Sequence, residues 1–389
     1  MGIAAAGSKL IRKMTVRDRG EGHRSATPLE LLFDLVSVIA FASAAAGLHH
    51  AIAENHIFDG LLKFSFAFFS VWWAWMNFTW LASGYDNDDV LYRILTMIMM
   101  TGALVIAASV PAFFKESELW LMLTGYIIMR VALVSLWIRA ALHNPEKRAT
   151  PVRCAVGYSV MQVLWIVIVL NGEALGGAFF PALFLGVIGE LAVPVYAEKA
   201  GGLAWHHHHI AERYGLLIII VLGETLLSAS IAIEAATGHG DVNFTLVGIA
   251  VSALVILFAM WWLYFSQDMR LEEENTKGLI LWSYGHVIVF GGGVAIGAGF
   301  AVLVDMESRH ADVSNLIGNL AVAIPIAFYL LGVWLVQDRF SLNCRSALVL
   351  PSCAILALVT PFFPFAIEAL AALLIFALLS RYLLNAAQR

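Results

Sequence analysis

The chain has 389 residues, of which 61% are hydrophobic and 13% are charged, and its formal net charge is −5 at pH 7. A soluble globular domain contains roughly 45–50% apolar and about 25% charged residues, so this composition argues against a soluble protein. Apolar runs of about 20 residues recur along the chain and predict an all-α, polytopic integral membrane protein. The sequence contains no basic, aromatic-rich stretch of the kind that binds nucleic acid. Its three cysteines form no CxxC motif or disulfide framework.

About twelve transmembrane helices are expected from the apolar runs. In chain order they cover residues 29–53, 57–83, 91–113, 118–142, 152–171, 176–197, 212–236, 243–266, 278–304, 315–336, 344–361 and 363–384. The last division stays open, because the prolines in the stretch 360–364 predict either a tight hairpin between two short spans or a kink in one long helix.

The positive charges predict the orientation of the chain. If the N-terminus faces the cytoplasm, nearly all Lys and Arg residues fall in cytoplasmic segments; Lys63, Lys115 and Arg309 fall outside, and Arg130 lies within a span. Positive residues favour the cytoplasmic side, so the N- and C-termini are both expected there. The predicted parts are a basic cytoplasmic tail (1–28), a first six-helix half (29–197), a His-rich cytoplasmic loop (198–211) and a second six-helix half (212–389).

A weak similarity between the halves suggests an internal repeat. Trp75 and Trp261 each lie near the end of the second span of their half, and an acidic turn follows each. Because six spans separate them, the halves would have the same orientation, which is a parallel 6+6 repeat as in some transporters. Chance is the alternative, since Trp and acidic residues are both common at membrane interfaces.

The first span opens with Thr27-Pro28-Leu29-Glu30. Thr followed three residues later by Glu predicts a capping box in which Glu30 satisfies the helix start, and Pro suits the first helical position. Asp34 lies one turn further in, on the same face as Glu30. A carboxylate there must pair, face water or be protonated. Asp34 is therefore a candidate for a functional role, and a structural contact between helices is the alternative.

Four consecutive histidines precede the seventh span, in the stretch WHHHHIAERYGLLIIIVLGE at residues 205–224. His209 and Arg213 are four apart on a helix and share a face. The stretch is interpreted as a wet, pH-sensitive interface, as half of a metal site, or as a proton relay or gate. The candidate metal ligands are His209, Glu212, Glu30 and Asp34. Arg213 is expected to pair with Asp34 or Glu30 if the first and seventh spans pack together.

Several charged residues are predicted deep in the bilayer. Glu224, twelve residues beyond the predicted start of its span, lies about 18 Å into a hydrocarbon core of about 30 Å. Arg130 is its candidate partner, and Glu190 competes for Arg130 at a similar depth. Each carboxylate belongs either to a static pair or to a transport pathway. Gly223 is expected to allow close approach of a helix or ligand. His286 is either a hydrogen-bonded core residue or a ligand, and the glycines after it predict close packing or a bendable helix; they are Gly291, Gly292, Gly293, Gly297 and Gly299.

The turn before the third span carries Asp88 and Asp89, with Arg93 one turn later. Asp is favoured at helix N-termini because it complements the helix dipole. The three residues are most simply a solvated cap of the third helix.

Three motifs together resemble a known family. LELLFDLV at residues 29–36, DDVLYR at 88–93 and HIAERYGLLIIIVLGE at 209–224 are similar to segments of the bacterial low temperature requirement A (LtrA) proteins, which are known for a cold-growth requirement. The resemblance runs through at least the ninth span and implies a polytopic membrane protein, but no particular activity. His206, His207 and His208 look like an addition to the family pattern. The positions in family motifs are Glu30, Phe33, Asp34, Asp89, Arg93, His209, Glu212, Arg213, Gly215, Gly223 and Glu224.

The function ranked first is a transporter or channel for a small ion or polar solute in the bacterial cytoplasmic (inner) membrane, coupled to protons through intramembrane carboxylates. Its transport and proton-coupling candidates are Asp34, Glu224, Arg130, Glu190 and His286, and its cytoplasmic-mouth candidates are Glu30, Asp89, Arg93, His209, Glu212 and Arg213. The alternative is a metal-dependent membrane enzyme with a cytoplasmic-side His/Glu/Asp site, although the sequence has no HExxH motif or nucleophile elbow. A regulatory protein is ranked last because the loops are too short for a signalling domain. The sequence predicts the lipid bilayer as a partner and leaves the solute, any cofactor and the oligomeric state open.

Overall fold

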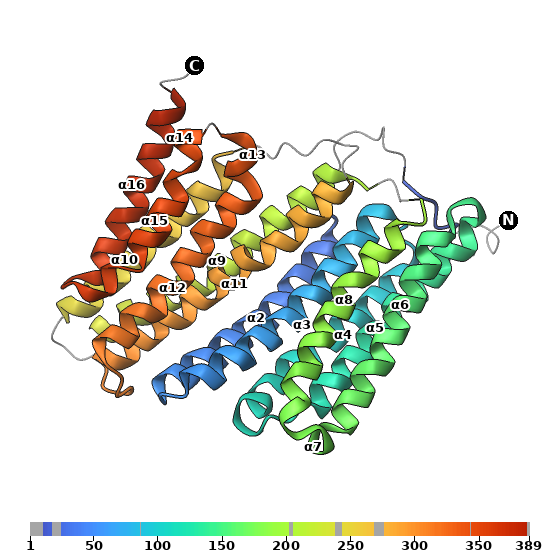
Figure 1. Ribbon diagram of the computed structural model, residues 1–389, viewed down its shortest axis with the longest axis horizontal. Coiled ribbons are helices and arrows are strands. Elements are labelled where there is room, and N and C mark those ends of the chain that lie inside the picture. Colours follow the sequence, from blue (N-terminus) through green and yellow to red (C-terminus); the bar gives the residue numbers. More distant parts are fainter. Residues whose placement is uncertain are drawn as a thin grey trace. The chain divides into compact units, whose positions relative to one another are not determined.

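The protein is described from a computed structural model that covers residues 11–17, 25–85, 87–201, 205–237, 243–267, 276–342 and 344–386. Within these ranges, the side chains of residues 224, 235–237, 276–277, 344–345 and 385–386 are not described. The described residues form helices and no strand, which confirms the predicted all-α class (Figure 1).

Among the described residues, 11 helical segments are long and apolar enough to cross a membrane. The helices are α2 (Pro28–Ala53), α3 (Ile57–Gly84), α4 (Val90–Glu116), α5 (Trp120–His143), α6 (Ala149–Leu170), α8 (Phe179–Glu198), α9 (His207–Thr237), α10 (Phe244–Phe265), α11 (Thr276–Glu307), α12 (Asn315–Val333) and α16 (Ala366–Ala386). The short α7 (Gly172–Leu175) and the turn η2 (Gly176–Ala178) lead into α8, and the π-helix η3 (Trp334–Asp338) and α13 (Arg339–Ser341) extend α12. These segments match eleven of the predicted spans.

The predicted span 344–361 is shorter than expected. It consists of α14 (Cys344–Ala347), α15 (Val349–Ala357) and the 3-10 turn η4 (Thr360–Phe362). Phe363 is extended and Phe365 has a positive φ of 59°, so the helical path is interrupted before α16 begins. Proline lacks the N–H that a continuing helix needs, and Pro361 and Pro364 both lie in this interval. The last two predicted spans are therefore two helices, and α15 packs against α16.

The chain forms two compact units, which we describe separately. Unit 1 comprises Met1–Ala40 and Ser70–Arg213, and unit 2 comprises Phe41–Phe69 and Tyr214–Arg389. The predicted halves divided the chain within the His-rich loop, whereas here Phe41–Phe69 groups with the C-terminal helices. The parallel repeat stays a prediction.

In unit 1, α4 packs against α5, α5 against α6, and α6 against α8. The α4–α5 contact is close because glycines face each other. A Cβ added to Gly102 would lie 2.5 Å from the carbonyl oxygen of Gly125, and one added to Gly125 would lie 2.7 Å from that of Gly102. Small residues allow helix backbones to approach in a bilayer, where no hydrophobic effect drives helices together. This packing holds α5, which carries two buried arginines.

In unit 2, α11 packs against α12, α12 against α15, and α10 against both α11 and α16. The most apolar stretch of α11 is 78% buried, the highest share of any candidate span. A Cβ on Gly292 would lie 2.9 Å from the carbonyl oxygen of Pro325, and one on Gly299 would overlap the carbonyl of Ala321. Of the two predicted alternatives for the glycines after His286, close packing and a bendable helix, these contacts show close packing.

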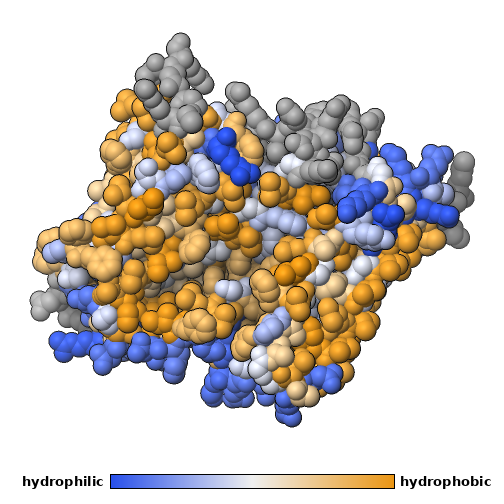
Figure 2. Space-filling model, in the orientation of Figure 1, coloured by the Kyte–Doolittle hydropathy of each residue, from blue (hydrophilic) through white to orange (hydrophobic). Residues whose placement is uncertain are grey.

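The outer sides of the helices are apolar. Figure 2 shows hydrophobic residues along the helix sides and hydrophilic residues gathered near helix ends. Large apolar side chains that are more than half exposed include Leu35, Val131, Phe184, Phe258 and Phe376. So much exposed apolar surface is unfavourable in water, and lipid is the solvent that it suits. The fold is that of a multi-pass membrane protein.

Candidate functional site

The candidate site begins at the first turn of α2. The Thr27 N–H donates to Glu30 Oε2 at 2.7 Å, and the Glu30 N–H donates to Thr27 Oγ1 at 3.3 Å. The helix starts at Pro28, so both the capping box and the proline position are confirmed. Glu30 is only 4% exposed, however, and its carboxylate also meets side chains of α9. Capping is therefore not its whole role.

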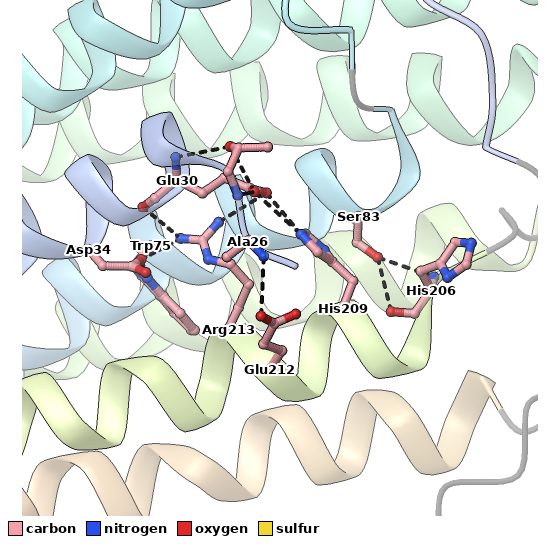
Figure 3. A network of polar contacts seen from close by, with 10 residues as sticks. Ala26, Glu30, Asp34, Trp75, Ser83, His206, His209, Glu212 and Arg213 are labelled. Carbon is pink, nitrogen blue, oxygen red and sulfur yellow. Dashed lines mark hydrogen bonds and ion pairs between the residues drawn. The ribbon is translucent and has the colours of Figure 1, made fainter. Parts of the chain in front are cut away.

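Arg213 of α9 lies between the two carboxylates of α2 (Figure 3). Its Nη2 donates to Asp34 Oδ1 in a short contact, and its Nη1 is 3.4 Å from Glu30 Oε1. Trp75 of α3 donates from Nε1 to the same Asp34 oxygen at 2.6 Å. Arg213 also lies over the rings of Trp75 and Phe78, with its Cζ 5.5 Å from each centroid. The expected pairing of Arg213 is thus confirmed, and it involves both carboxylates.

His209 lies one turn before Arg213 and contacts Glu30. Its Nε2 is 3.1 Å from Glu30 Oε1 and 3.4 Å from Oε2. The backbone N–H of Ala26 donates to Glu212 Oε1 at 3.3 Å, so Glu212 contacts the segment before α2 rather than the two carboxylates. We call Glu30, Asp34, His209 and Arg213 the Arg213 cluster.

The start of α9 is also fixed to α3. The His206 N–H donates to Ser83 Oγ at 3.2 Å, and the Ser83 hydroxyl donates to the His206 carbonyl at 3.3 Å (Figure 3). The helix begins at His207, five residues before the predicted start of the span, so most of the histidines belong to a helix and not to a loop. His209 is buried, whereas its neighbour His208 is exposed.

The charges of the Arg213 cluster do not balance. Two carboxylates face one guanidinium, so the formal charge is −1 while His209 is neutral. All four side chains are at most 5% exposed. Among the described residues, Asp34 Oδ2, His209 Nδ1 and Arg213 Nε have no hydrogen-bond partner. A buried net charge is costly, so the cluster favours uptake of one positive charge.

The Arg213 cluster lies near one end of the spans. Asp34 and Arg213 are each six residues into their helices, about 9 Å at ~1.5 Å per residue. With 26 residues, α2 is about 39 Å long and exceeds a hydrocarbon core of about 30 Å. The cluster therefore lies near the edge of the core, where protons from water can reach it over a short distance.

Comparison with known proteins identifies the family of this chain. The family of bacterial low temperature requirement A proteins (LtrA) matches residues 25–385, nearly the whole chain. The chain belongs to the LtrA family. An uncharacterized protein of Rhizobium meliloti (strain 1021) is 26% identical over 293 residues, which cover 70% of this chain and 68% of that protein. No solved structure matches this LtrA protein. The resemblance inferred from the three motifs is confirmed, and the Arg213 cluster draws its members from the first and third of these LtrA motifs.

This LtrA protein contains a second buried arginine pair in unit 1. Arg130 of α5 donates from Nη2 to Glu190 Oε1 of α8 at 2.5 Å. Trp73 and Trp165 donate to the two oxygens of Glu190 at 2.8 and 2.9 Å. Glu190 is thus the partner of Arg130, and it has three donors. The pair is formally neutral.

Aromatic rings enclose the guanidinium of this second pair. The Cζ of Arg130 lies 5.0 Å from the Tyr126 ring centroid and 4.8 Å from that of Tyr158. A cavity of about 10 Å³, near the minimum that accommodates one water molecule, is lined in part by Arg130 and Asn77. Arg130 is ten residues from the start of α5, about 15 Å, so this neutral pair lies deeper than the Arg213 cluster.

The prediction of a solvated cap at Asp89 is half right. Asp89 is the N-cap of α4 and accepts the Tyr92 N–H at 2.8 Å, but it is only 2% exposed. Its partner is Arg139 of α5, which binds both carboxylate oxygens, whereas the exposed Arg93 pairs with Asp88 at 2.8 Å. Burial opposes ionisation, but hydrogen bonds from Arg139 and from the backbone of Arg12 and Tyr92 outweigh it and hold the pKa of Asp89 below its ordinary value.

Part of the predicted cytoplasmic tail is docked on unit 1. In the segment Ile11–Arg17, the Arg12 N–H donates to Asp89 Oδ2 at 2.7 Å and the Met14 N–H to His143 Nδ1 at 2.8 Å. Asn144 binds the Met14 carbonyl at 2.7 Å, and the Met14 side chain is fully buried. Sequence reasoning missed Arg139, His143 and Asn144, because they looked like ordinary polar residues at the end of a span.

Two more predicted site residues, Glu224 and His286, lie on α9 and α11. Glu224 lies on α9, but its side chain is outside the described part of the structure. No described heavy atom lies within 4 Å of a Cβ added to Gly223, so the close approach expected there is not seen. His286 in unit 2 is fully buried, with Nδ1 2.8 Å from the Trp282 carbonyl and Nε2 3.0 Å from the Tyr264 hydroxyl. These contacts fit a hydrogen-bonded core residue.

Unit 2 contains a buried ion pair that sequence reasoning missed. Asp338, in the π-helix η3, is 2.5 Å from Arg381 of α16, and Arg381 also donates to the Leu263 carbonyl at 2.7 Å. Arg381 looked like a flanking cytoplasmic charge. The signal that could have identified the pair was Asp338 itself, an acidic residue directly after an apolar span.

The structure does not assemble the predicted metal site. Across the described ranges, no group of three or more His, Cys, Asp or Glu side chains is placed to hold a metal ion. Arg213 occupies the space between the carboxylates of Glu30 and Asp34, where a cation would have to bind.

Proposed function

We propose that this LtrA protein is a membrane transporter for a small ion or polar solute and that the Arg213 cluster couples transport to protons. The observation that carries the proposal is the unbalanced charge of this cluster, which is buried among α2, α3 and α9. Ionisable groups inside membrane helices are rare because they are costly, and they commonly mark ion or proton pathways. A cluster that needs one more positive charge has a reason to bind and release a proton.

The position of the cluster supports the same proposal. It lies near the edge of the hydrocarbon core, so a proton can exchange with water without crossing the membrane. The deeper pair of Arg130 and Glu190 is neutral, and Glu190 has three donors, so it has no comparable need for a proton. We therefore assign coupling to the Arg213 cluster and a holding role to the deeper pair, which the sequence had also placed among the transport residues. A role for Glu224 as a deep carboxylate stays a prediction.

The experiment is a flux measurement in proteoliposomes with an internal pH-sensitive dye, across a panel of monovalent and divalent salts and small polar solutes. The test variant is Asp34→Asn. Asparagine keeps an oxygen for Trp75 but makes the cluster neutral without a proton, so proton flux coupled to a solute should fall at least tenfold. The matched control is Lys115→Gln, which alters an exposed ion pair outside the candidate site and should leave the flux unchanged.

If Asp34→Asn elutes as a folded protein and keeps its solute-coupled proton flux, the proposed coupling site is contradicted. Loss of flux in Asp34→Asn and Lys115→Gln alike would indicate general damage to the protein. Glu224→Gln is measured in parallel, and loss of flux there would extend the pathway along α9.

A further inference from the structure

We infer that His209 carries the exchangeable proton of the Arg213 cluster and that protonation of His209 decides whether Arg213 is shared by both carboxylates or committed to Asp34; this inference rests on the proposed transport function. It names the residue that carries the proton, which the proposed function leaves open.

The geometry around His209 fixes where a proton can be added. Nε2 faces the two oxygens of Glu30 at 3.1 and 3.4 Å, so in the neutral ring the hydrogen lies on Nε2, because a bare nitrogen would repel the carboxylate. Nδ1 is then an empty acceptor, buried and without a described partner. Adding a proton at Nδ1 keeps the hydrogen bond to Glu30, makes the ring cationic and brings the formal charge of the cluster from −1 to zero.

The carboxylates are poorer carriers. Glu30 accepts from the Thr27 N–H, from the Thr27 hydroxyl at 2.9 Å and from His209, and all of these contacts favour its ionised form. Asp34 accepts from Arg213 and from Trp75, and protonating it would leave a buried guanidinium without its closest counter-charge. His209 is also four residues closer than Asp34 is to the start of its own helix, and hence nearer to water.

A metal cation is disfavoured as the coupling ion. The guanidinium of Arg213 contacts both carboxylates, so a bound metal ion would lie within a few ångströms of a fixed positive charge. A proton on His209 avoids this repulsion, because Glu30 lies between the ring and Arg213 and offsets both charges.

Protonation changes how Glu30 is shared. Arg213 Nη1 and His209 Nε2 contact the same oxygen, Glu30 Oε1, at 3.4 and 3.1 Å. When His209 is cationic, it holds Glu30, and Arg213 remains with Asp34 in its short contact. When His209 is neutral, Arg213 is the one cation left for Glu30 and is drawn toward it. Because Glu30 and Asp34 are one turn apart on α2, this exchange shifts the contact of α9 along α2.

Other groups around His209 have to be considered in any pH dependence. From α2, the site is faced by Glu30 and Asp34; from α4, by Tyr92, which interacts with Arg213. On α9 itself the neighbours are His207, His208, Glu212 and Arg213, and His206 lies directly before the helix. Of these, histidines alone ordinarily change charge between pH 5 and 8, so the test must separate His209 from the three histidines before it.

The experiment is a nitrogen-15 NMR titration of histidine-labelled protein in nanodiscs from pH 8 to pH 5. The His209 signal is assigned by its loss in His209→Gln. We expect it to change from a neutral ring with hydrogen on Nε2 to a cationic ring, and in Glu30→Gln we expect proton affinity at least tenfold weaker, because the carboxylate is gone. The matched control His208→Gln removes the signal of an exposed neighbour and should leave the His209 titration unchanged.

A His209 signal that stays neutral down to pH 5, or that titrates identically in wild type and Glu30→Gln, would overturn the inference. If His209→Gln keeps full solute-coupled proton flux, the inference fails while the transport proposal stands. If His209 titrates as expected but no tested solute moves with protons, the proton carrier stands and the transport proposal fails.

Discussion

Arg130 and Arg213 are both buried in unit 1, yet their surroundings differ in one respect. Arg130 faces one carboxylate, whose oxygens are satisfied by two Trp donors as well. Arg213 faces two carboxylates, and several polar atoms around it have no described partner. The Arg130–Glu190 pair is formally neutral, so adding a proton would give it a net charge. The Arg213 cluster has a formal charge of −1, and adding a proton would make it neutral. The formal charge therefore distinguishes a pair that holds helices together from a cluster that can bind a proton.

The holding role of the deeper pair can be tested with Glu190→Gln. This change leaves the guanidinium of Arg130 buried without a counter-charge, which typically costs about 3–5 kcal/mol. The free energy of unfolding is measured by SDS titration in mixed micelles. The control is Arg130→Met with Glu190→Gln, which removes both charges and keeps one acceptor oxygen for one of the two Trp donors, so most of the stability should return. If Glu190→Gln alone is as stable as wild type, the Arg130–Glu190 pair does not hold α5 and α8 together.

At the scale of elements, the segment Ile11–Arg17 acts as a strap across the ends of helices in unit 1. Backbone groups at residues 12, 14 and 17 bond to Asp89, His143 and the Gly84 carbonyl. Asp89 is the centre of this contact, because it caps α4, binds Arg139 of α5 and accepts from the strap. One carboxylate therefore couples the tail to two helices.

Acid should loosen the strap by protonating Asp89. The folded-state pKa of Asp89 is below its ordinary value, which is about 3.9 in the unfolded chain. Its stabilisation is therefore fully present above about pH 4 and is lost as the pH falls toward the lower folded-state pKa. In Arg139→Gln, the folded-state pKa lies closer to the unfolded one, so the loss should be smaller, and in Asp89→Asn this part of the pH dependence should vanish. Thermal unfolding in detergent between pH 7 and 3 checks both; identical profiles in all three proteins would contradict the assignment.

The elements that sequence reasoning predicted well are those set by apolar run length. Hydropathy predicts where the apolar part of a helix begins. The helix α9 itself begins earlier in the chain, at His207, because contacts with Ser83 and Glu30 stabilise its first turn. Which distant residues form ion pairs depends on the tertiary structure, which hydropathy does not reveal. The pairing of Arg213 was predictable because few cations lie near Asp34, whereas Arg139 was overlooked because a charge at a span end has an ordinary explanation in solvation.

At the scale of the whole molecule, the orientation in the membrane decides which compartment supplies the protons. The Arg213 cluster lies at the N-terminal end of α2 and of α9, and positive charges predict that this end faces the cytoplasm. In the proposed transport function, the coupling proton would then exchange with the cytoplasm.

Two exposed glutamates that flank α5 test the orientation. Glu118 precedes the helix and Glu146 follows it, beside Lys147 and Arg148. With the natural cysteines replaced, Glu118→Cys should react with a membrane-impermeant maleimide in intact spheroplasts, and Glu146→Cys should react only after lysis. The reverse labelling pattern would mean that the chain has the opposite orientation and that the Arg213 cluster exchanges protons with the outer side of the membrane. The 24 residues of α5, about 36 Å at ~1.5 Å each, suffice to cross a core of about 30 Å. The two glutamates should therefore be labelled from opposite sides, and labelling of both from one side would contradict α5 as a spanning helix.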